Sequence, residues 1–406
     1  MRLEQRISRN EARAAALGEL KSLLGTLKSA VNGLRNPPGL LAASENAFES
    51  RQAFLSAAGG TRPEELLGIS LENGASLGSF SVEVERLATA HKLAASATGS
   101  ADQTLADAWN AGASFSGSLQ IGLAGGPTAA VAVTGAMDIH DLRATVNAAS
   151  AQTGVQANVL AVSDSDHRLV LTATTTGRAI ELADAGGDSV TALLGASEIQ
   201  AAQTSRIVVD GVAVERDGNR IDDLMAGVTI DLYRAEPGTA VGVQVEPSLA
   251  AAKEQITGFA AAYNALRDFV AKHAVVGDGG EVAEDAVLFG DRTLRSVAQT
   301  LGDLVGSATA GLDPAALGTL RDVGISLGSG GRLQVDEKTL DARLLNKLDE
   351  VRRVFEFTAA GSSGDLSVYA RTNALADLSF TVAVSDPDAD GTSDAATIDG
   401  VAAVVS

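Results

Sequence analysis

The segment from Asp386 to Asp394 has the residue types and spacing of a calcium loop. Carboxylates recur at every second position, Asp386, Asp388 and Asp390, then Gly391 follows and Asp394 comes three residues later. Calcium prefers roughly six to eight oxygen ligands, and such a loop supplies several of them. A threonine stands at the twelfth position, where a bidentate glutamate is expected, and no helix pattern flanks the loop. The sequence leaves open a calcium site formed by these four aspartates or a solvated turn rich in aspartate.

Other arrangements that could do chemistry are missing from the sequence. The histidines, His91, His140, His167 and His273, are far apart along the chain, and none has the spacing of a metal site. The chain has no cysteine, which excludes disulfides and thiolate chemistry. No nucleophile elbow precedes a helix pattern, and no glycine-rich phosphate loop follows a strand pattern. We therefore expect no catalytic residue and no cofactor apart from the candidate calcium ion, and the sequence indicates that the protein is not an enzyme.

Composition limits the classes of partner. The 406 residues carry a formal net charge of -20, with a pI of about 4.6. Nucleic-acid binders present clustered lysine and arginine, so this acidic chain is not expected to bind nucleic acid. No basic segment followed by an apolar run opens the chain, and no stretch of about 18 apolar residues occurs, so we expect neither a cleavable signal peptide nor a membrane span. A chain of this length predicts several domains.

The β-structure around which the chain is organised is predicted between residues 206 and 246. Apolar residues alternate on both sides of Asp210-Gly211, which is the strongest short-range signal of a tight hairpin. A second hairpin is predicted from residues 228–232 and 241–245 around a Glu-Pro-Gly turn, and the spacing of residues 221–225 between the two predicts a short turn of helix. Strands this short need further strands to form a stable sheet, and residues 80–87 are expected to pair with them.

A separate α+β module is predicted between these strands in the sequence. Residues 118–123, 129–133, 155–162 and 168–174 alternate as strands, and residues 139–152 have helical spacing with Asp138 as N-cap. The order strand, strand, helix, strand, strand suggests a self-contained insertion. Residues 96–109 are expected to form a loop with one helical turn, and residues 40–61 an extended crossing.

Helical patterns precede and follow this β-structure. Residues 3–34 form one long amphipathic pattern, which the segment Asn36-Pro37-Pro38-Gly39 ends, and residues 256–269 form a second. Asp291 and Asp336 are expected to cap two further helices, and a glycine turn within residues 324–335 predicts a hairpin. We expect the first pattern to pack along the second as a stem. The pattern is already running at Met1 and the chain ends on a predicted strand, so we expect a fragment of a longer protein.

Six stretches, in this order, resemble the bacterial flagellar filament cap family, also called flagellar hook-associated protein 2. They are LEQRISRNEARAAALGELKSLLGTL, GSFSVEVERLATAHKL, VDGVAVERDGNRIDDLMAGVTIDLYRAEPG, ITGFAAAYNALRDFV, GDRTLRSVAQTL and GISLGSGGRLQVDEKTLDARLLNKLDEVRRVF. The resemblance implies an α+β multidomain fold, with a helical stem from both chain ends and two nested β-rich head domains. We assign residues 1–58 and 248–360 to the stem, 59–110 and 200–247 to an inner head, 111–199 to an inserted outer head, and 361–406 to an extra, incomplete β segment.

The family further implies a function and partners. Its members form a ring at the tip of the extracellular filament, where they promote ordered polymerisation of exported flagellin and prevent its loss. The implied partners are flagellin, further copies of the same chain and the proteins of the hook–filament junction. We expect the inner head to form the subunit contacts, with Ile207, Val209, Val228 and Ile230 as candidate interface residues. We expect the family's terminal helical segments, which enter the filament channel, to lie outside this sequence. The alternative is a secreted β-rich adhesin or a calcium-stabilised surface module.

Overall fold

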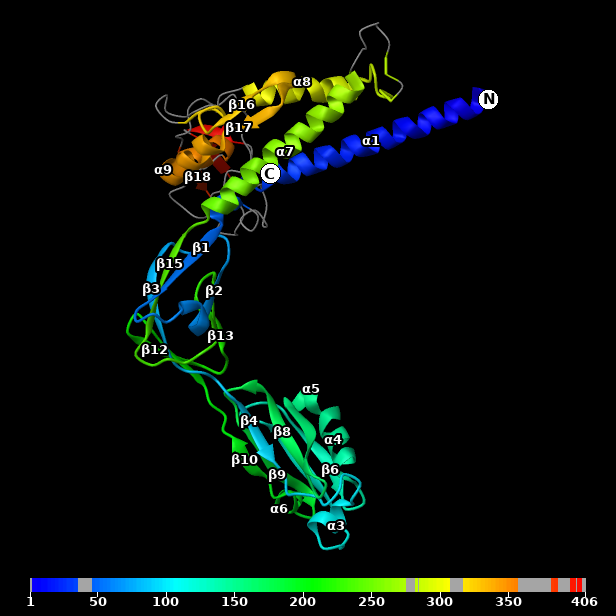
Figure 1. The fold of residues 1–406 in the computed structure, drawn as a ribbon, viewed down its shortest axis with the longest axis vertical. Coiled ribbons are helices and arrows are strands. Elements are labelled where there is room, and N and C mark those ends of the chain that lie inside the picture. The colour runs from blue at the N-terminus through cyan, green and yellow to red at the C-terminus, as the bar shows by residue number, and fades with distance from the viewer. Residues whose placement is uncertain are drawn as a thin grey trace. The chain divides into compact units, whose positions relative to one another are not determined.

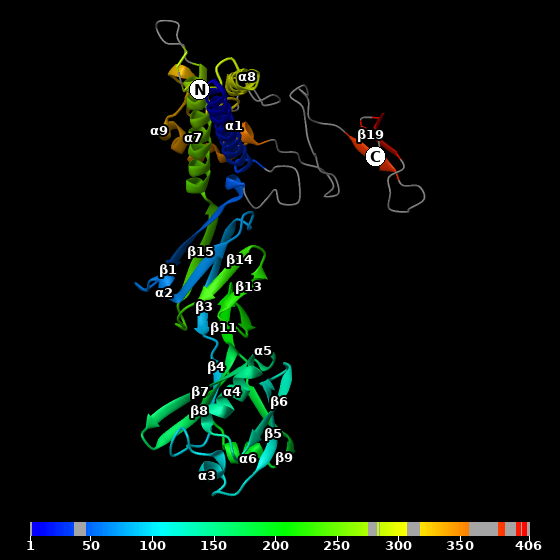
Figure 2. The same ribbon diagram turned by 90° about the vertical axis from the view of Figure 1, so that its right-hand side faces the viewer.

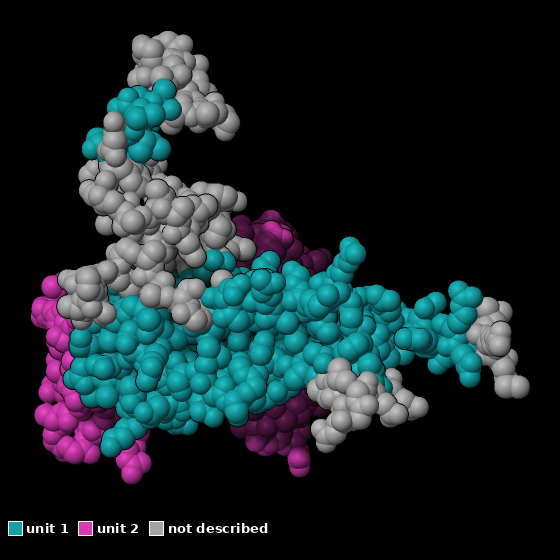
Figure 3. All heavy atoms as spheres, turned by 90° about the horizontal axis from the view of Figure 1, so that it is seen from above, with its two compact units in different colours: residues 1–50, 247–406 teal, residues 51–246 magenta. Residues whose placement is uncertain are grey.

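The computed structural model (Figure 1) describes residues 2–35, 46–274, 282–283, 285–306, 317–356, 381–385, 395–398 and 400–403. The chain forms two compact units, Met1–Ser50 with Pro247–Ser406 and Arg51–Glu246 (Figure 3). The first contains the helical stem and the second contains both heads. The predicted stem boundary at residue 58 is corrected to residue 50, because the segment just after it is a strand of the inner head.

Two long helices, α1 and α7, lie side by side in the stem (Figures 1 and 2). The stem elements are α1 (Arg2–Asn32), η2 (Ala47–Glu49), α7 (Leu249–Ala274), α8 (Arg292–Gly306), β16 (Ile325–Leu327), η3 (Ser329–Gly331), β17 (Leu333–Val335) and α9 (Glu337–Phe355). The buried side chains of α7, including Ile256, Tyr263 and Leu266, share one core with Leu20 of α1. The Gln255 side chain also donates a 2.8 Å hydrogen bond to the Ala30 carbonyl of α1. The predicted packing of the first helix along the second is therefore confirmed.

Aspartates begin two of the stem helices, as predicted. The Asp291 carboxylate accepts a 2.8 Å hydrogen bond from the Thr293 amide at the start of α8, and Asp336 accepts one from the Thr339 amide in α9. Asp291 also accepts a 2.6 Å hydrogen bond from Arg13 of α1. This bond, together with the two α8 backbone amides, lowers the pKa of the Asp291 carboxyl. One carboxylate thus both caps α8 and ties it to α1.

A histidine is buried at the end of α7. The His273 side chain is 3% exposed, its ring lies 4.5 Å from that of Phe269, and its Nδ1 has no hydrogen-bond partner among the described residues. Burial lowers the pKa of His273, as does the neighbouring charge of Lys272, whereas Glu19 and Asp285 act in the opposite direction. The stem therefore favours the neutral imidazole.

The inner head packs a five-stranded sheet against a three-stranded sheet. The first has the order β1 (Arg51–Ala57), β15 (Ala240–Pro247), β3 (Gly78–Arg86), β11 (Ser205–Val209), β12 (Val212–Arg216), and the second β13 (Arg220–Met225), β14 (Val228–Leu232), β2 (Leu67–Leu71), preceded by α2 (Pro63–Leu66). Alternate side chains of both sheets fill one core, as in other two-layer β folds. The two predicted hairpins are only partly confirmed: β11 pairs with β12, but β14 pairs with β13 and β2, while β15 lies in the other sheet.

Two expectations for the inner head were wrong. Residues 221–225 form strand β13 rather than a turn of helix, since Ile221 pairs with Ile230 and Met225 with Val228. The register shifts between these two pairs, and this irregularity produces the helix-like spacing of apolar residues. The expected extended crossing at residues 40–61 contains strand β1, whose place at the sheet edge depends on a partner almost 200 positions later in the chain.

The outer head is a second two-sheet module. One sheet has the order β10 (Ser197–Gln200), β4 (Ala90–Ala94), β8 (Asp166–Thr176), β7 (Val155–Ser163), and the other β6 (Thr128–Thr134), β5 (Ser116–Leu123), β9 (Ile180–Gly187). Its helices are α3 (Leu105–Trp109), α4 (Ile139–Ala148), α5 (Ser150–Thr153) and α6 (Val190–Leu194). Asp138 caps α4 with a capping box, as predicted. The predicted boundary between the inner and outer heads at residue 110 is wrong. The outer head already includes β4 and α3, which contribute Leu93 and Leu105 to its core.

The tail contains a small sheet formed by β18 (Val382–Ser385), β19 (Ala395–Ile398) and β20 (Val401–Ala403). The candidate calcium ligands Asp386, Asp388, Asp390 and Asp394 lie outside the described residues. Across the described ranges, no helix combines the length and hydropathy that crossing a membrane would need.

Candidate functional site

The four candidate interface residues line the inside of the inner head. Ile207 and Ile230 are fully buried, Val228 is 5% exposed, and Val209 packs against the same core from a partly buried position. These side chains therefore hold the two sheets together and are not displayed to a partner. A subunit contact through these strands stays a prediction, and it would have to use their outward-facing neighbours.

The turn between β11 and β12 has the geometry that its sequence predicts. Asp210 and Gly211 both have positive φ, 48° and 82°, as a two-residue type I′ turn requires. The Asp210 carboxylate accepts hydrogen bonds from the Ser81 amide, at 2.8 Å, and the Ser81 hydroxyl, at 3.0 Å. These bonds tie the β11–β12 hairpin to β3 and occupy the carboxylate, so Asp210 has a structural role in the five-stranded sheet.

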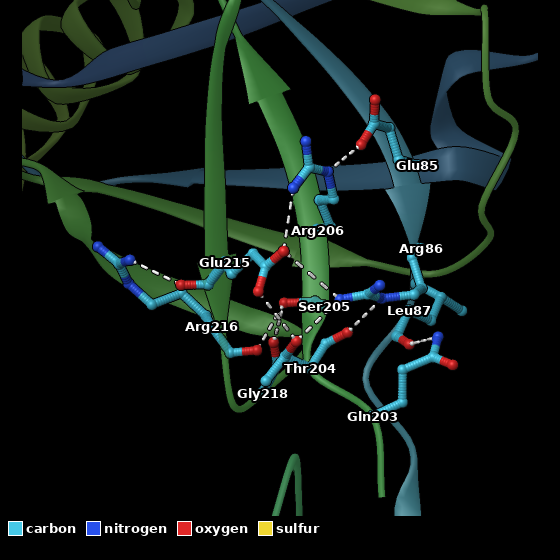
Figure 4. A network of polar contacts seen from close by, with 10 residues as sticks. All are labelled: Glu85, Arg86, Leu87, Gln203, Thr204, Ser205, Arg206, Glu215, Arg216 and Gly218. Atoms are coloured by element: carbon cyan, nitrogen blue, oxygen red, sulfur yellow. Dashed lines mark hydrogen bonds and ion pairs between the residues drawn. The ribbon is translucent and has the colours of Figure 1, made fainter. Parts of the chain in front are cut away.

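Charged side chains of alternating sign cross the strands β3, β11 and β12 (Figure 4). Arg206 lies opposite Glu215 and donates to it at 3.0 Å, and it also donates to Glu85. Arg86 lies 3.6 Å from Glu215, which joins the two arginines through one carboxylate. A shift of register between Arg206 and Ile207 in the β3–β11 pairing places Glu85 and Arg86 beside the same residue of β11. We call Glu85, Arg86, Arg206 and Glu215 the charged ladder.

Each charge of the ladder lies against a charge of opposite sign. The hydrogen bonds that Arg206 donates to Glu85 and Glu215 raise the pKa of Arg206, and the bond that Glu215 accepts from Arg206 lowers the pKa of Glu215. All four side chains are at least partly exposed, and exposed ion pairs add little to stability. Such a row can discriminate between partners by charge, because a partner that places a like charge against any of these side chains binds less favourably. It contains no activated nucleophile.

A shallow groove of about 450 Å³ lies on the same five-stranded sheet. Small residues of β1, β3 and β15 line it, among them Ser56, Ser81 and Gly242, and so does Phe54 on the edge strand, which is 50% exposed. A Cβ atom on Gly242 would lie 2.9 Å from the Ser56 hydroxyl, which would have to rotate away. The lining is mixed, because the apolar residues Leu55, Phe80 and Val243 lie beside polar ones such as Ser79 and Gln244.

The described residues provide no metal centre. Within them, no group of three histidine, cysteine, aspartate or glutamate side chains could hold an ion. His91 is buried between the sheets of the outer head, where its Nδ1 accepts from the Ile180 amide at 2.8 Å and its Nε2 lies 2.9 Å from Glu198. Its role is to join strands β4, β9 and β10.

Sequence reasoning identified the strands of this surface but missed the ladder and the groove. The pairing of Arg206 with Glu215 could have been predicted. Both residues alternate with the apolar residues of β11 and β12, and the tight turn fixes which residues of the two strands lie opposite each other. The position of Glu85 depends on the irregular pairing with β3, which the sequence does not reveal.

Three protein-family models match the chain. "Flagellar hook-associated protein 2 N-terminus" matches residues 1–91, and "Flagellar hook-associated protein 2 C-terminus" matches residues 202–384. The "Flagellin hook IN motif" matches residues 118–175, which lie in the outer head. The two terminal models belong to one family, occur in the expected order and together cover more than half of the chain.

Curated relatives and solved structures agree with these matches. The chain is similar to B-type flagellar hook-associated protein 2 of Pseudomonas aeruginosa, with 26% identity over 368 residues, or 84% of this chain and 72% of the relative. It is also similar to flagellar hook-associated protein 2 of Aeromonas caviae, with 22% identity over 355 residues and the same two shares. The crystal structure of the flagellar cap protein FliD D1-D2-D3 domains from Escherichia coli has a TM-score of 0.62 at 22% identity, covering 84% of this chain and 89% of that chain. This last likeness establishes the fold.

Proposed function

Since the chain belongs to the flagellar hook-associated protein 2 family, we propose that it is a subunit of the cap at the tip of the bacterial flagellar filament. In this position it promotes ordered polymerisation of exported flagellin and prevents flagellin from being lost. The observation that carries the proposal is the match of both terminal models to the stem and inner head, in the order that a nested fold requires. The comparisons do not support the alternative of an adhesin.

The partners follow from this position. They are flagellin, further copies of this chain in a ring, and the proteins of the hook–filament junction. Ring contacts are heterologous, so each subunit needs two different patches that fit one another. We assign one patch to the inner head, where the charged ladder and the groove lie on the five-stranded sheet. The net charge of -20 favours weak, partly polar contacts, which allow the ring to shift as each flagellin arrives.

The proposed role needs no catalysis. The inner-head surface contains ion pairs and small side chains but no arrangement of nucleophile and base, so the protein acts by shape and charge. We place it outside the cell, on the flagellum. Calcium in the aspartate-rich segment remains a separate proposal, tested by titration below.

Immunogold labelling of filaments tests the proposed location. Filaments from the source organism are labelled with an antibody raised against the heads, and an antibody against flagellin serves as the control. We expect gold from the head antibody at one end of each filament and flagellin label along its length. Head label distributed along the filament or confined to the cell body would contradict the proposal.

A further inference from the structure

The chain passes between the inner and outer heads twice, through residues 87–89 and 201–204. These two connectors pair with each other: the Thr89 amide donates to the Gln203 carbonyl at 2.8 Å, and the Gln203 side chain donates to the Leu87 carbonyl at 3.1 Å. Two paired connectors form a ribbon, which can bend and twist about its length. The connectors by themselves would therefore leave a hinge between the heads.

A third segment, the turn between β12 and β13, reaches this ribbon. The Asn219 side chain accepts a 2.7 Å hydrogen bond from the Ala88 amide and donates a 3.0 Å bond to the Ala88 carbonyl. Ala88 is 5% exposed, so one side chain satisfies both buried backbone groups of the connector. The turn is itself held in place, because the buried Ser205 hydroxyl donates to the Gly218 carbonyl at 2.7 Å (Figure 4).

The same turn also contacts the outer head directly. The Thr176 hydroxyl at the end of β8 donates to the Asp217 carbonyl at 2.5 Å, and Arg178 donates to the Asp217 carboxylate at 3.0 Å. Between them, Gly177 has a φ of 79°, and a Cβ atom placed there would lie 2.6 Å from the Asp217 Cα. Only glycine permits both this backbone conformation and this close approach.

We propose that residues 217–219 form a clamp that joins the two heads into one rigid body. The clamp binds the first connector through Asn219 and the outer head through Asp217. Bending between the two heads therefore requires several hydrogen bonds to break together. A force on the inner head would then be passed to the outer head instead of being lost in a hinge. The proposal rests on the contacts of residues 217–219 alone and does not depend on the proposed cap function.

Distance measurements between spin labels test the clamp. The chain has no cysteine, so Val162→Cys on β7 and Val212→Cys on β12, which replace side chains 57% and 64% exposed, give one label in each head. Double electron–electron resonance is then recorded for the parent and for Gly177→Ala, which forces the clamp away. Gly125→Ala is the matched control, because Gly125 also has positive φ, 70°, but no atom within 4 Å of an added Cβ.

We expect one narrow distance distribution for the parent and for Gly125→Ala, and loss of that narrow distribution for Gly177→Ala. A second pair of variants leaves the backbone unchanged. Arg178→Gln removes the bond to Asp217, whereas Arg234→Gln breaks a comparable exposed ion pair with Glu236 within the inner head. Arg178→Gln should broaden the distribution and Arg234→Gln should not. Equal widths within both pairs, or a parent already as broad as Gly177→Ala, would overturn the clamp.

Discussion

The substitution Leu20→Ala tests whether α1 and α7 support each other in the stem. Leu20 is 3% exposed and shares a core with α7, whereas Leu17 on the same helix is 39% exposed. Truncating a buried leucine removes its apolar contacts and leaves a cavity, at a cost of about 2–5 kcal/mol. Since alanine and leucine have similar helix propensities, Leu17→Ala should change the free energy of unfolding by no more than about 0.5 kcal/mol.

Circular dichroism at the helical band isolates this effect. The four long helices α1, α7, α8 and α9 all lie in the first unit, while α4 of the outer head, at 10 residues, is the longest helix described in the second. Urea unfolding followed by this signal therefore reports mainly on the stem, even though the two units need not unfold together. A lower urea midpoint for Leu20→Ala than for Leu17→Ala is the expected result. Equal midpoints for the two variants would refute the packing of α1 on α7.

Three further predictions concern other parts of the chain. Folding lowers the pKa of His273, so as the pH falls the unfolded chain takes up a proton before the folded chain does. The contribution of His273 to stem stability should therefore be fully present above about pH 6.5 and be lost as the pH falls from there toward the pKa of the folded state. His273→Leu should abolish this slope in urea titrations between neutral and mildly acidic pH, and an unchanged slope would contradict the assignment. Asn264 both donates to and accepts from the Leu333 backbone, at 2.9 and 2.7 Å, so Asn264→Ala should lower the free energy of unfolding by about 1–3 kcal/mol. Asn346→Ala on the exposed face of α9 should have little effect, and equal losses would show that the β17 contact is unimportant. If the aspartate-rich segment binds calcium, calorimetric titration should give heat that Asp390→Asn removes, and no heat at millimolar calcium would exclude the site.

Local signals predicted much of the fold. The Asp210-Gly211 pair predicted the β11–β12 hairpin, and the caps Asp138, Asp291 and Asp336 marked helix starts correctly, because a turn or a cap is decided by residues within a few positions. The long apolar stripes of α1 and α7 predicted a common seam for a similar reason, since each buries one face.

The errors arose where structure depends on distant residues. Strand β1 and strand β4 acquire their places from partners far along the chain, which local pattern does not contain. The irregular register in β13 imitated helical spacing. The candidate interface residues were chosen as apolar side chains of the right strands, but alternation alone does not say which face of a strand is covered. The clamp at Asp217 and Asn219 depends on backbone groups of two other segments, so it had no signal in the sequence.

The central claim is that this chain caps the filament, and the fate of flagellin tests it most directly. The gene is deleted in the source organism, and flagellin is measured separately in attached filaments and in the culture medium, with and without the gene restored on a plasmid. We predict that deletion moves most flagellin into the medium and leaves cells with few or short filaments, and that the restored gene reverses both effects. Filaments of normal length in the deletion strain, with no rise of flagellin in the medium, would contradict the account.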